Sequence, residues 1–245
     1  MSFFATLNED GAYDLTAAGY AVLVIVMVAL IILASALQKN RRRMSTKQLA
    51  FSAIAMALAV VTSFIKVIHM PMGGAVTLWS MLFIVLVGYW YGLSAGITTA
   101  VAYGILQLIQ DPYIISLPQL LTDYILAFGS LGISGLFCGK KILFVNEKKN
   151  STHTISGLVP GYILAVLLRL FFSTLSGVIF FGIYAPDNFP NPLIYSLVYN
   201  GSYIGLEAVM TLILISLPPV VSALEKVKRL ATTDQAENTR KPDKS

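Results

Sequence analysis

The sequence predicts an all-α integral membrane protein, and three observations lead to this prediction. Hydrophobic residues make up 56% of the 245-residue chain and charged residues only 12%, which gives a mean hydropathy of +0.75. The charged residues lie mainly between long apolar blocks rather than inside them. Each of these blocks is long enough to form a helix that crosses a bilayer. A soluble domain of this length would need far more polar surface, so that class is excluded.

We expect seven apolar blocks to cross the roughly 30 Å hydrocarbon layer as helices. Residues 1–16 form the segment before the first block and are expected outside the cell. The first block and its basic linker, residues 17–47, have acidic residues before the apolar run and arginines after it. A signal peptide has the reverse polarity, so we expect an uncleaved anchor helix. The blocks cover residues 17–37, 48–68, 76–91, 94–110, 117–138, 155–183 and 195–222.

Basic residues predict how the chain is oriented in the membrane. Lysine and arginine are concentrated in residues 38–47, in residues 139–150 and after Glu225, and the positive-inside rule places such segments in the cytoplasm. Seven spans then put the N-terminus outside and the C-terminus inside a multi-pass cell-membrane protein. The net charge of +5 thus reflects orientation, and no nucleic-acid partner is predicted. Residues 223–245 are polar and lack apolar periodicity, so we expect a disordered cytoplasmic tail.

The sequence does not predict an ATPase or a metal site. The segment SGLFCGKK, residues 134–141, lacks the spaced glycine and the hydroxyl residue of a phosphate-binding loop. The single cysteine, Cys138, excludes a disulfide framework and a cysteine metal cluster. No metal or other cofactor is predicted.

The motif GISG, residues 132–135, matches the nucleophile motif of intramembrane serine proteases and keeps that class as a remote alternative. Such chemistry needs a histidine base within the membrane. The only histidines, His69 and His153, are predicted at helix ends on opposite sides of the bilayer. We therefore interpret the two glycines as small residues that allow close helix contact.

Ionisable and aromatic residues stand within the later apolar blocks. Asp123 lies inside the block 117–138, and Gln119, four residues earlier, shares its helical face. A charged group within a span costs about 2.5–3.5 kcal/mol on insertion scales and usually faces a cavity or a partner. Asp123 with nearby tyrosines would suit an organic cation, whereas an ion pair with Arg169 is the alternative. Two stripes follow i, i+4 spacing: Arg169, Ser173, Gly177 and Phe181, and Tyr195, Tyr199, Tyr203 and Glu207.

Four longer segments extend a recognisable pattern over most of the chain. They are FIKVIHMPMGGAVTLWSML (64–82), GILQLIQDPYIISLPQLLTDYILAFGSLGISGLF (104–137), RLFFSTLSGVIFFGIYAP (169–186) and YSLVYNGSYIGLEA (195–208). In this order and spacing they resemble the thiamine-specific substrate-binding subunits (S components) of energy-coupling-factor transporters. The resemblance implies a six-helix S-component bundle over residues 48–222, preceded here by one additional transmembrane helix.

The resemblance also implies a ligand site near the extracellular side of the membrane. The acidic–tyrosine pair of the family falls on Asp123 and Tyr124. Ser173 stands where a histidine is common, and Phe181 stands where the family can have tryptophan, so a related pyrimidine-type compound or another small vitamin is an alternative substrate. The other implied ligand-facing positions are Tyr103, Tyr113, Tyr195 and Asn200.

Two further features follow from the resemblance. The loop of residues 69–77, which contains Met72, Gly73 and Gly74, would close over the ligand as a lid. Ala53 and Ala57, in AIAMA, would dock the coupling transmembrane subunit, because small residues permit close helix approach. The implied protein is a non-enzymatic transport subunit for thiamine, whose partners are the bilayer, this coupling subunit and two ATPase subunits.

Overall fold

The computed structural model describes residues 5–7, 13–18, 21, 25, 45–110, 113–139, 157–186 and 189–240, with the backbone alone at 5–7, 13–15 and 234–240. Most of the predicted additional helix, residues 17–37, and most of its basic linker lie outside the described residues. A two-stranded hairpin, β1 (Ala5–Leu7) and β2 (Tyr13–Leu15), lies against helix α7 (Leu158–Phe180).

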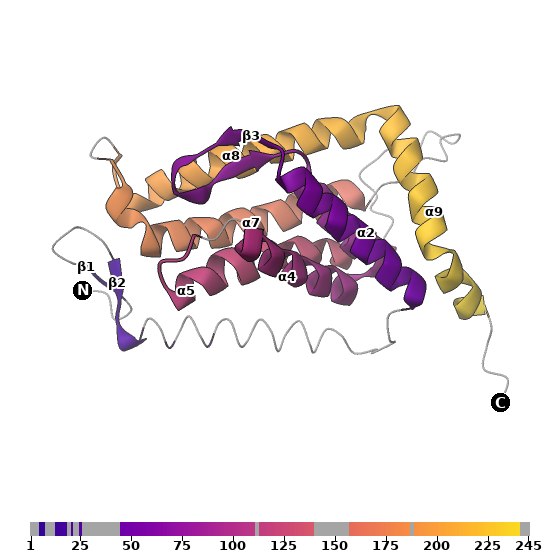
Figure 1. The fold of residues 1–245 in the computed structure, drawn as a ribbon, viewed down its shortest axis with the longest axis horizontal. Helices are drawn as coiled ribbons and strands as arrows, with labels where there is room; N and C mark the ends of the chain where they lie inside the picture. The colour runs from indigo at the N-terminus through magenta and orange to yellow at the C-terminus, as the bar shows by residue number, and fades with distance from the viewer. Residues whose placement is uncertain are drawn as a thin grey trace.

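The described chain from residue 45 onward is an elongated bundle of apolar helices (Figure 1). Among the described residues, five helical segments are long and apolar enough to cross a membrane. The block predicted over 76–91 forms a shorter helix of 12 residues, α3 (Ser80–Tyr91). The five longer segments are α2 (Thr46–Ser63), α4 (Leu93–Gln110), residues Leu117–Phe137, α7 and α8 (Pro192–Ser216).

The segment Leu117–Phe137 is a composite helix. It begins as α5 (Leu117–Leu120), where the Ser116 side chain accepts a hydrogen bond from Gln119 N and Pro118 occupies the first turn. It continues through the π-helical η2 (Leu121–Leu126), α6 (Ala127–Gly129) and the 3₁₀-helical η3 (Ser130–Phe137). The π-helical part contains Asp123, and such local widening of a helix is frequent at functional sites.

Residues predicted to belong to the ends of two spans instead form a hairpin. Strands β3 (Lys66–His69) and β4 (Ala75–Thr77) pair antiparallel, with His69 opposite Ala75. The 3₁₀ turn η1 (Pro71–Gly73) joins them, and both Met72 and Gly73 have positive φ, at 59° and 88°. The prediction of helix up to residue 68 and from residue 76 is therefore wrong, because this turn and its β-branched flanks favour a hairpin over a continuous helix.

The prediction of disorder is also wrong for residues 223–240, because α9 (Pro218–Arg240) continues the chain as a helix, and residues 241–245 lie outside the described residues. Leu224, Val227 and the buried Ala231 pack on the core at helical spacing. The Lys228 ammonium lies 3.9 Å from the centroid of the Tyr89 ring. Apolar periodicity over these residues was the missed signal. The prolines at the start of α9 explain why α8 ends at Ser216, before the predicted 222.

Helices α3 and α4 and the segment η3 meet along a seam of glycines. A Cβ built on Gly96 would lie 2.6 Å from the carbonyl oxygen of Gly132, and one built on Gly88 would lie 2.9 Å from the amide nitrogen of Gly135. Side chains are thus excluded where these backbones touch. Ser134 is fully buried and donates to the Val85 carbonyl at 2.9 Å. The GISG motif therefore packs helices together, as interpreted from the sequence.

Candidate ligand-binding pocket

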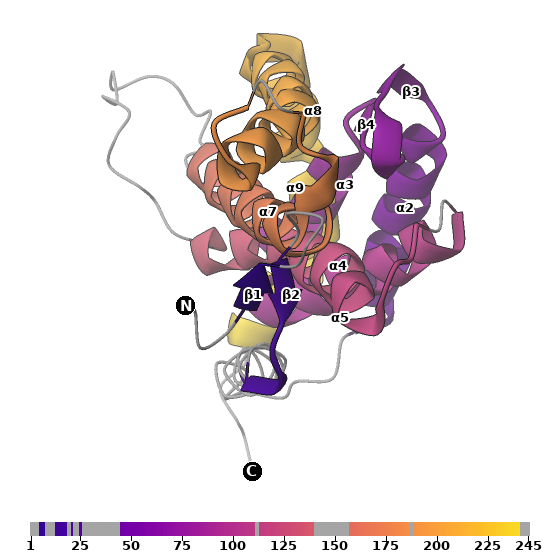
Figure 2. The same ribbon diagram turned by 90° about the vertical axis from the view of Figure 1, so that its left-hand side faces the viewer.

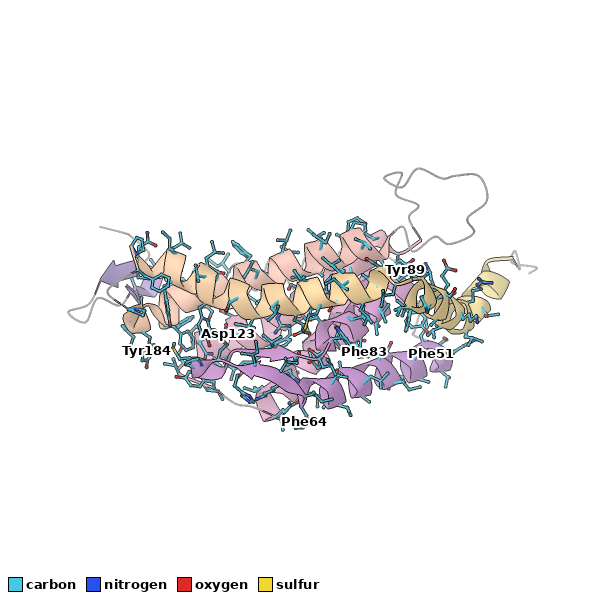
Figure 3. All side chains as sticks on the ribbon, turned by 90° about the horizontal axis from the view of Figure 1, so that it is seen from above. Phe51, Phe64, Phe83, Tyr89, Asp123 and Tyr184 are labelled. Atoms are coloured by element: carbon cyan, nitrogen blue, oxygen red, sulfur yellow. The ribbon has the colours of Figure 1, made fainter. Side chains whose placement is uncertain are left out.

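A pocket lies between the β3–β4 hairpin and the helices at one end of the bundle. Helices α2, α4, α7 and α8 contribute to its walls, together with the Asp123 region. Figure 2 shows the hairpin beside α2, with α8 across from it and α7 and α4 below α8. In Figure 3, Asp123 lies toward the end of the bundle that holds Tyr184, away from Tyr89 and Phe51. The hairpin contributes Met72, Gly73 and Gly74 to the lining of the pocket.

Most residues predicted to face a ligand lie in this one pocket. They come from separate parts of the sequence, and the fold brings them together. Tyr103 is the exception, because it is fully buried outside the pocket lining, with its ring 5.4 Å from that of Phe128. The predicted residues that line the pocket are Asp123, Tyr124, Tyr113, Tyr195, Asn200, Phe181 and Ser173, and from the lid Met72, Gly73 and Gly74.

Asp123 is held by a neighbouring amide rather than by a cation. Its Oδ2 accepts a hydrogen bond from Gln119 Nε2 at 2.6 Å. Gln119 is in turn fixed by Tyr113, whose carbonyl accepts from Nε2 at 3.1 Å, and by Ile115, whose N–H donates to Oε1 at 3.1 Å. Among the described residues no ion pair joins Asp123 to Arg169. The carboxylate lines the pocket, and no cation of the described chain is paired with it.

Arg169 lies in the same pocket wall and is 9% exposed. Its Nε and Nη1 atoms have no hydrogen-bond partner among the described residues. The guanidinium carbon lies 4.3 Å from the centroid of the Phe128 ring, so cation–π contact stabilises its charge. The alternative in which Asp123 serves only as the partner of Arg169 is not the arrangement in this structure.

Aromatic rings line the same pocket as the Asp123 carboxylate. The Tyr113 ring lies 5.7 Å from the Phe181 ring, and the Tyr195 ring lies 6.1 Å from the Tyr199 ring. Tyr124 fixes the backbone beside them, because its hydroxyl accepts a hydrogen bond from Tyr113 N at 2.9 Å. A carboxylate among ring faces is suited to a flat organic cation.

Asn200 uses its side chain to join α7 and α8. Its Nδ2 donates to the carbonyl oxygens of Ser173 at 3.2 Å and Ser196 at 2.9 Å, and to Ser196 Oγ at 3.2 Å. Its Oδ1 accepts from the Tyr203 hydroxyl at 2.8 Å. Gly177 allows this approach, since a Cβ there would lie 3.2 Å from Asn200 Nδ2. Asn200 thus lines the pocket with its amide already hydrogen-bonded.

The lid hairpin is attached to α8 at two points. At its tip, the Tyr199 hydroxyl donates to the Pro71 carbonyl and accepts from Gly74 N at 3.2 Å. At its base, the buried Glu207 carboxylate accepts from Thr77 Oγ1 at 2.6 Å and from Thr77 N at 3.3 Å. The same carboxylate accepts from Ser80 Oγ and Met81 N, both at 3.1 Å. Glu207 therefore caps the start of α3 and ties the base of the lid to α8.

Sequence reasoning missed one side of the pocket. Phe128 was overlooked because an aromatic residue in an apolar block gives no distinct signal. Gln107 and Gln110 did give one, since two amides three residues apart in a span are unusual. The missed lining residues on this side are Ser63, Lys66, Gln107, Gln110 and Phe128, and Ser196 on α8 was missed as well.

The two alanines predicted to dock a coupling subunit lie on the outside of α2. Ala53 and Ala57 are exposed, whereas Ser52, Ala55 and Ala59 face the core. The exposed face therefore presents these two small side chains beside the larger Ile54 and Leu58.

Comparison with known proteins places this architecture in a family. The family described as "Thiamine transporter protein" matches residues 49–226. Over 154 residues the chain is 36% identical to "Thiamine transporter ThiT" of Bacillus subtilis (strain 168), and the match covers 62% of this chain and 79% of that protein. A solved structure of ThiT from Listeria monocytogenes has a similar fold, with a TM-score of 0.55 at 23% identity over 71% of this chain and 96% of that chain. Because the family match extends over well more than half of the sequence, the chain belongs to the thiamine transporter protein family.

Proposed function

We propose that this protein is the substrate-binding membrane subunit of an energy-coupling-factor uptake transporter and that its substrate is thiamine. The observation that carries the proposal is the Asp123 carboxylate, which is unpaired with any cation of the described chain and lines the same pocket as the rings of Tyr113, Phe181 and Tyr195. Thiamine carries a permanently charged thiazolium ring and a neutral aminopyrimidine. Membership of the thiamine transporter protein family supports this choice of substrate.

In this proposal, closure of the lid strengthens the electrostatic attraction between Asp123 and the bound cation. The thiazolium ring lies between aromatic faces with Asp123 as its counter-charge, and Coulomb attraction strengthens as the β3–β4 hairpin excludes water. Tyr199 and Glu207 hold the hairpin against α8 once it has closed. The protein performs no covalent chemistry on the substrate.

Ligand identification tests the proposed substrate. The protein is purified in detergent from cells grown with thiamine, and the bound small molecule is released and identified by mass spectrometry. Titration of ligand-free protein with thiamine follows, with riboflavin and biotin as controls. We expect thiamine to be recovered and to bind in preference to both controls. Recovery of a different pyrimidine, or the absence of thiamine binding, would assign the pocket to another small vitamin, which Ser173 in place of a histidine would favour.

Transport requires partners, and the exposed alanines of α2 support a docking site for one of them. We place the coupling transmembrane subunit against Ala53 and Ala57, with two ATPase subunits bound to it in the cytoplasm. Close approach of two helices in a membrane depends on small residues such as these.

The same proposal gives the orientation of the chain, with the N-terminus outside and the C-terminus in the cytoplasm. After Cys138 is replaced by serine, single cysteines at positions 8 and 146 test this orientation in intact cells. An impermeant thiol reagent should label a cysteine that replaces Asn8 and leave one that replaces Asn146 unlabelled. Labelling of position 146 in sealed cells would contradict the seven-span topology.

A further inference from the structure

Three polar side chains from α2 and α4 form a cluster in the pocket wall, apart from the Asp123 region. Gln107 Nε2 donates to Ser63 Oγ at 3.0 Å and to Gln110 Oε1 at 3.2 Å. Ser63 Oγ lies 2.7 Å from the Val60 carbonyl and 3.0 Å from Gln110 Oε1, to either of which it can donate. All three side chains line the cavity. The proposed function makes no use of them.

Two polar groups of this cluster have no hydrogen-bond partner among the described residues. An amide has two N–H donors and a carbonyl acceptor. Both N–H groups of Gln107 are used within the cluster, whereas its Oε1 has no partner among the described residues. Gln110 uses its Oε1, whereas its Nε2 has no partner there. If the oxygen and nitrogen positions are exchanged in both amides, Gln110 becomes the donor and Gln107 the acceptor within the cluster. One carbonyl and one amino group then still have no partner among the described residues.

The open amide groups lie on α4 and not on α8. Asn200, the amide that the family resemblance places against the ligand, already has three acceptors around its Nδ2 and a donor at its Oδ1. A polar ligand atom would have to compete with those internal bonds. Gln107 and Gln110 present an acceptor and a donor that water or a ligand must satisfy, since unsatisfied polar groups in a closed pocket are costly.

We propose that Gln107 and Gln110 form a neutral polar subsite, which binds a ligand group that donates and accepts a hydrogen bond at the same time. Ser63 positions the two amides. The inference rests on the proposed function, because it concerns the same pocket. Thiamine has two such groups, the amino-substituted edge of its pyrimidine and its primary alcohol. With the cationic ring at Asp123, this second contact would fix which way the ligand lies in the pocket.

Two variants and two analogues test the subsite. Gln107→Met and Gln110→Met keep the length of the side chain and remove the amide. One analogue has a hydrogen atom in place of the pyrimidine amino group, and the other has chlorine in place of the hydroxyl. Each variant should weaken thiamine binding by roughly 3- to 15-fold, as expected for a lost hydrogen bond. The analogue that lacks the contacted group should bind the wild-type protein and the variants equally, whereas the other analogue should show the same loss as thiamine.

Ser63→Ala provides a milder variant, which removes the positioning hydroxyl and leaves both amides in place. It should give a smaller loss with the same dependence on the analogue, and thermal unfolding of each ligand-free variant checks the fold. Unchanged thiamine affinity in the variants, or an equal loss for thiamine and both analogues, would overturn the subsite while the proposed function stands. Absence of thiamine binding by the wild-type protein would overturn the proposed function and the subsite with it.

Discussion

The hydroxyl of Tyr199 accepts a hydrogen bond from the backbone N–H of Gly74 at 3.2 Å and donates to the carbonyl of Pro71. This places one side chain of α8 at both sides of the lid turn. A Cβ on Gly74 would lie 2.7 Å from that hydroxyl, so glycine is what permits the contact. Tyr199 is therefore the attachment that must break when the tip of the hairpin lifts.

Tyr199→Phe should speed ligand release, because the ring remains and both hydrogen bonds are lost. The two bonds together contribute about 1–2 kcal/mol, which corresponds to a dissociation rate roughly 5- to 30-fold faster. Stopped-flow release of thiamine measures the rate. Ser202→Ala is the matched control, because its exposed hydroxyl bonds only within α8, to the Tyr199 carbonyl. Equal release rates for Tyr199→Phe and the wild-type protein would show that the tip contact does not limit opening.

Glu207→Gln should lower the stability of the ligand-free protein. The buried carboxylate accepts four hydrogen bonds, and an amide group would turn an N–H toward donors. A loss of about 2–4 kcal/mol is expected, since hydrogen bonds to a charged group are the stronger ones. Thermal unfolding in detergent measures the effect. Thr77→Val removes only one side-chain donor and should cost less, so an equal cost for both variants would contradict the capping role.

Asp123→Asn should weaken thiamine binding without collapsing the fold. It keeps the size of the side chain and removes the charge, so about 2–5 kcal/mol is lost, or roughly 30- to several-thousand-fold in affinity. Isothermal titration calorimetry measures the affinity. A neutral pyrimidine that lacks the thiazolium should bind both proteins about equally. If ligand-free Asp123→Asn is strongly destabilised while its thiamine affinity is unchanged, Asp123 is structural.

Ala57→Trp should block assembly with the coupling subunit and leave thiamine affinity unchanged, because a large ring prevents close helix approach. Copurification with the coupling subunit and the ATPases measures assembly. Leu167→Trp on α7 is the control, since Leu167 is also exposed, at 56%, but lies on another helix. Normal copurification and uptake by Ala57→Trp would show that the docking surface lies elsewhere.

The sequence was informative wherever a signal repeats along a helix. Composition and block length predicted the membrane class, and i, i+4 spacing placed Ser173, Gly177 and Phe181 in one pocket wall, as the structure has them. The turn at Met72 and Gly73 was harder to foresee, because its apolar flanks read as continuations of the neighbouring spans. In an apolar chain, the sequence of a short strand resembles that of a helix end. Only the turn that joins two such strands distinguishes a hairpin from the ends of two helices.

Contacts between distant segments could not be read from either segment alone. Glu207 lies 130 residues from Thr77, and no local pattern links a glutamate in α8 to the first residues of α3. Tyr103 shows the reverse problem, since it occupies a position implied to face the ligand and yet packs on Phe128. Small rotations of a helix decide which of its faces meets a cavity, and these depend on packing against every neighbour.

The glycine seam between α3, α4 and η3 has a consequence for how such a protein can acquire a new substrate. Where backbone meets backbone at Gly96 and Gly132, no side chain can be enlarged without moving the helices apart. Variation that alters ligand choice must therefore fall on the side chains that line the pocket, such as Gln107, Asp123 and Tyr199. The glycine contacts between α3, α4 and η3 thus preserve the shape of the bundle, whereas substitutions among the pocket side chains can change which ligand is bound.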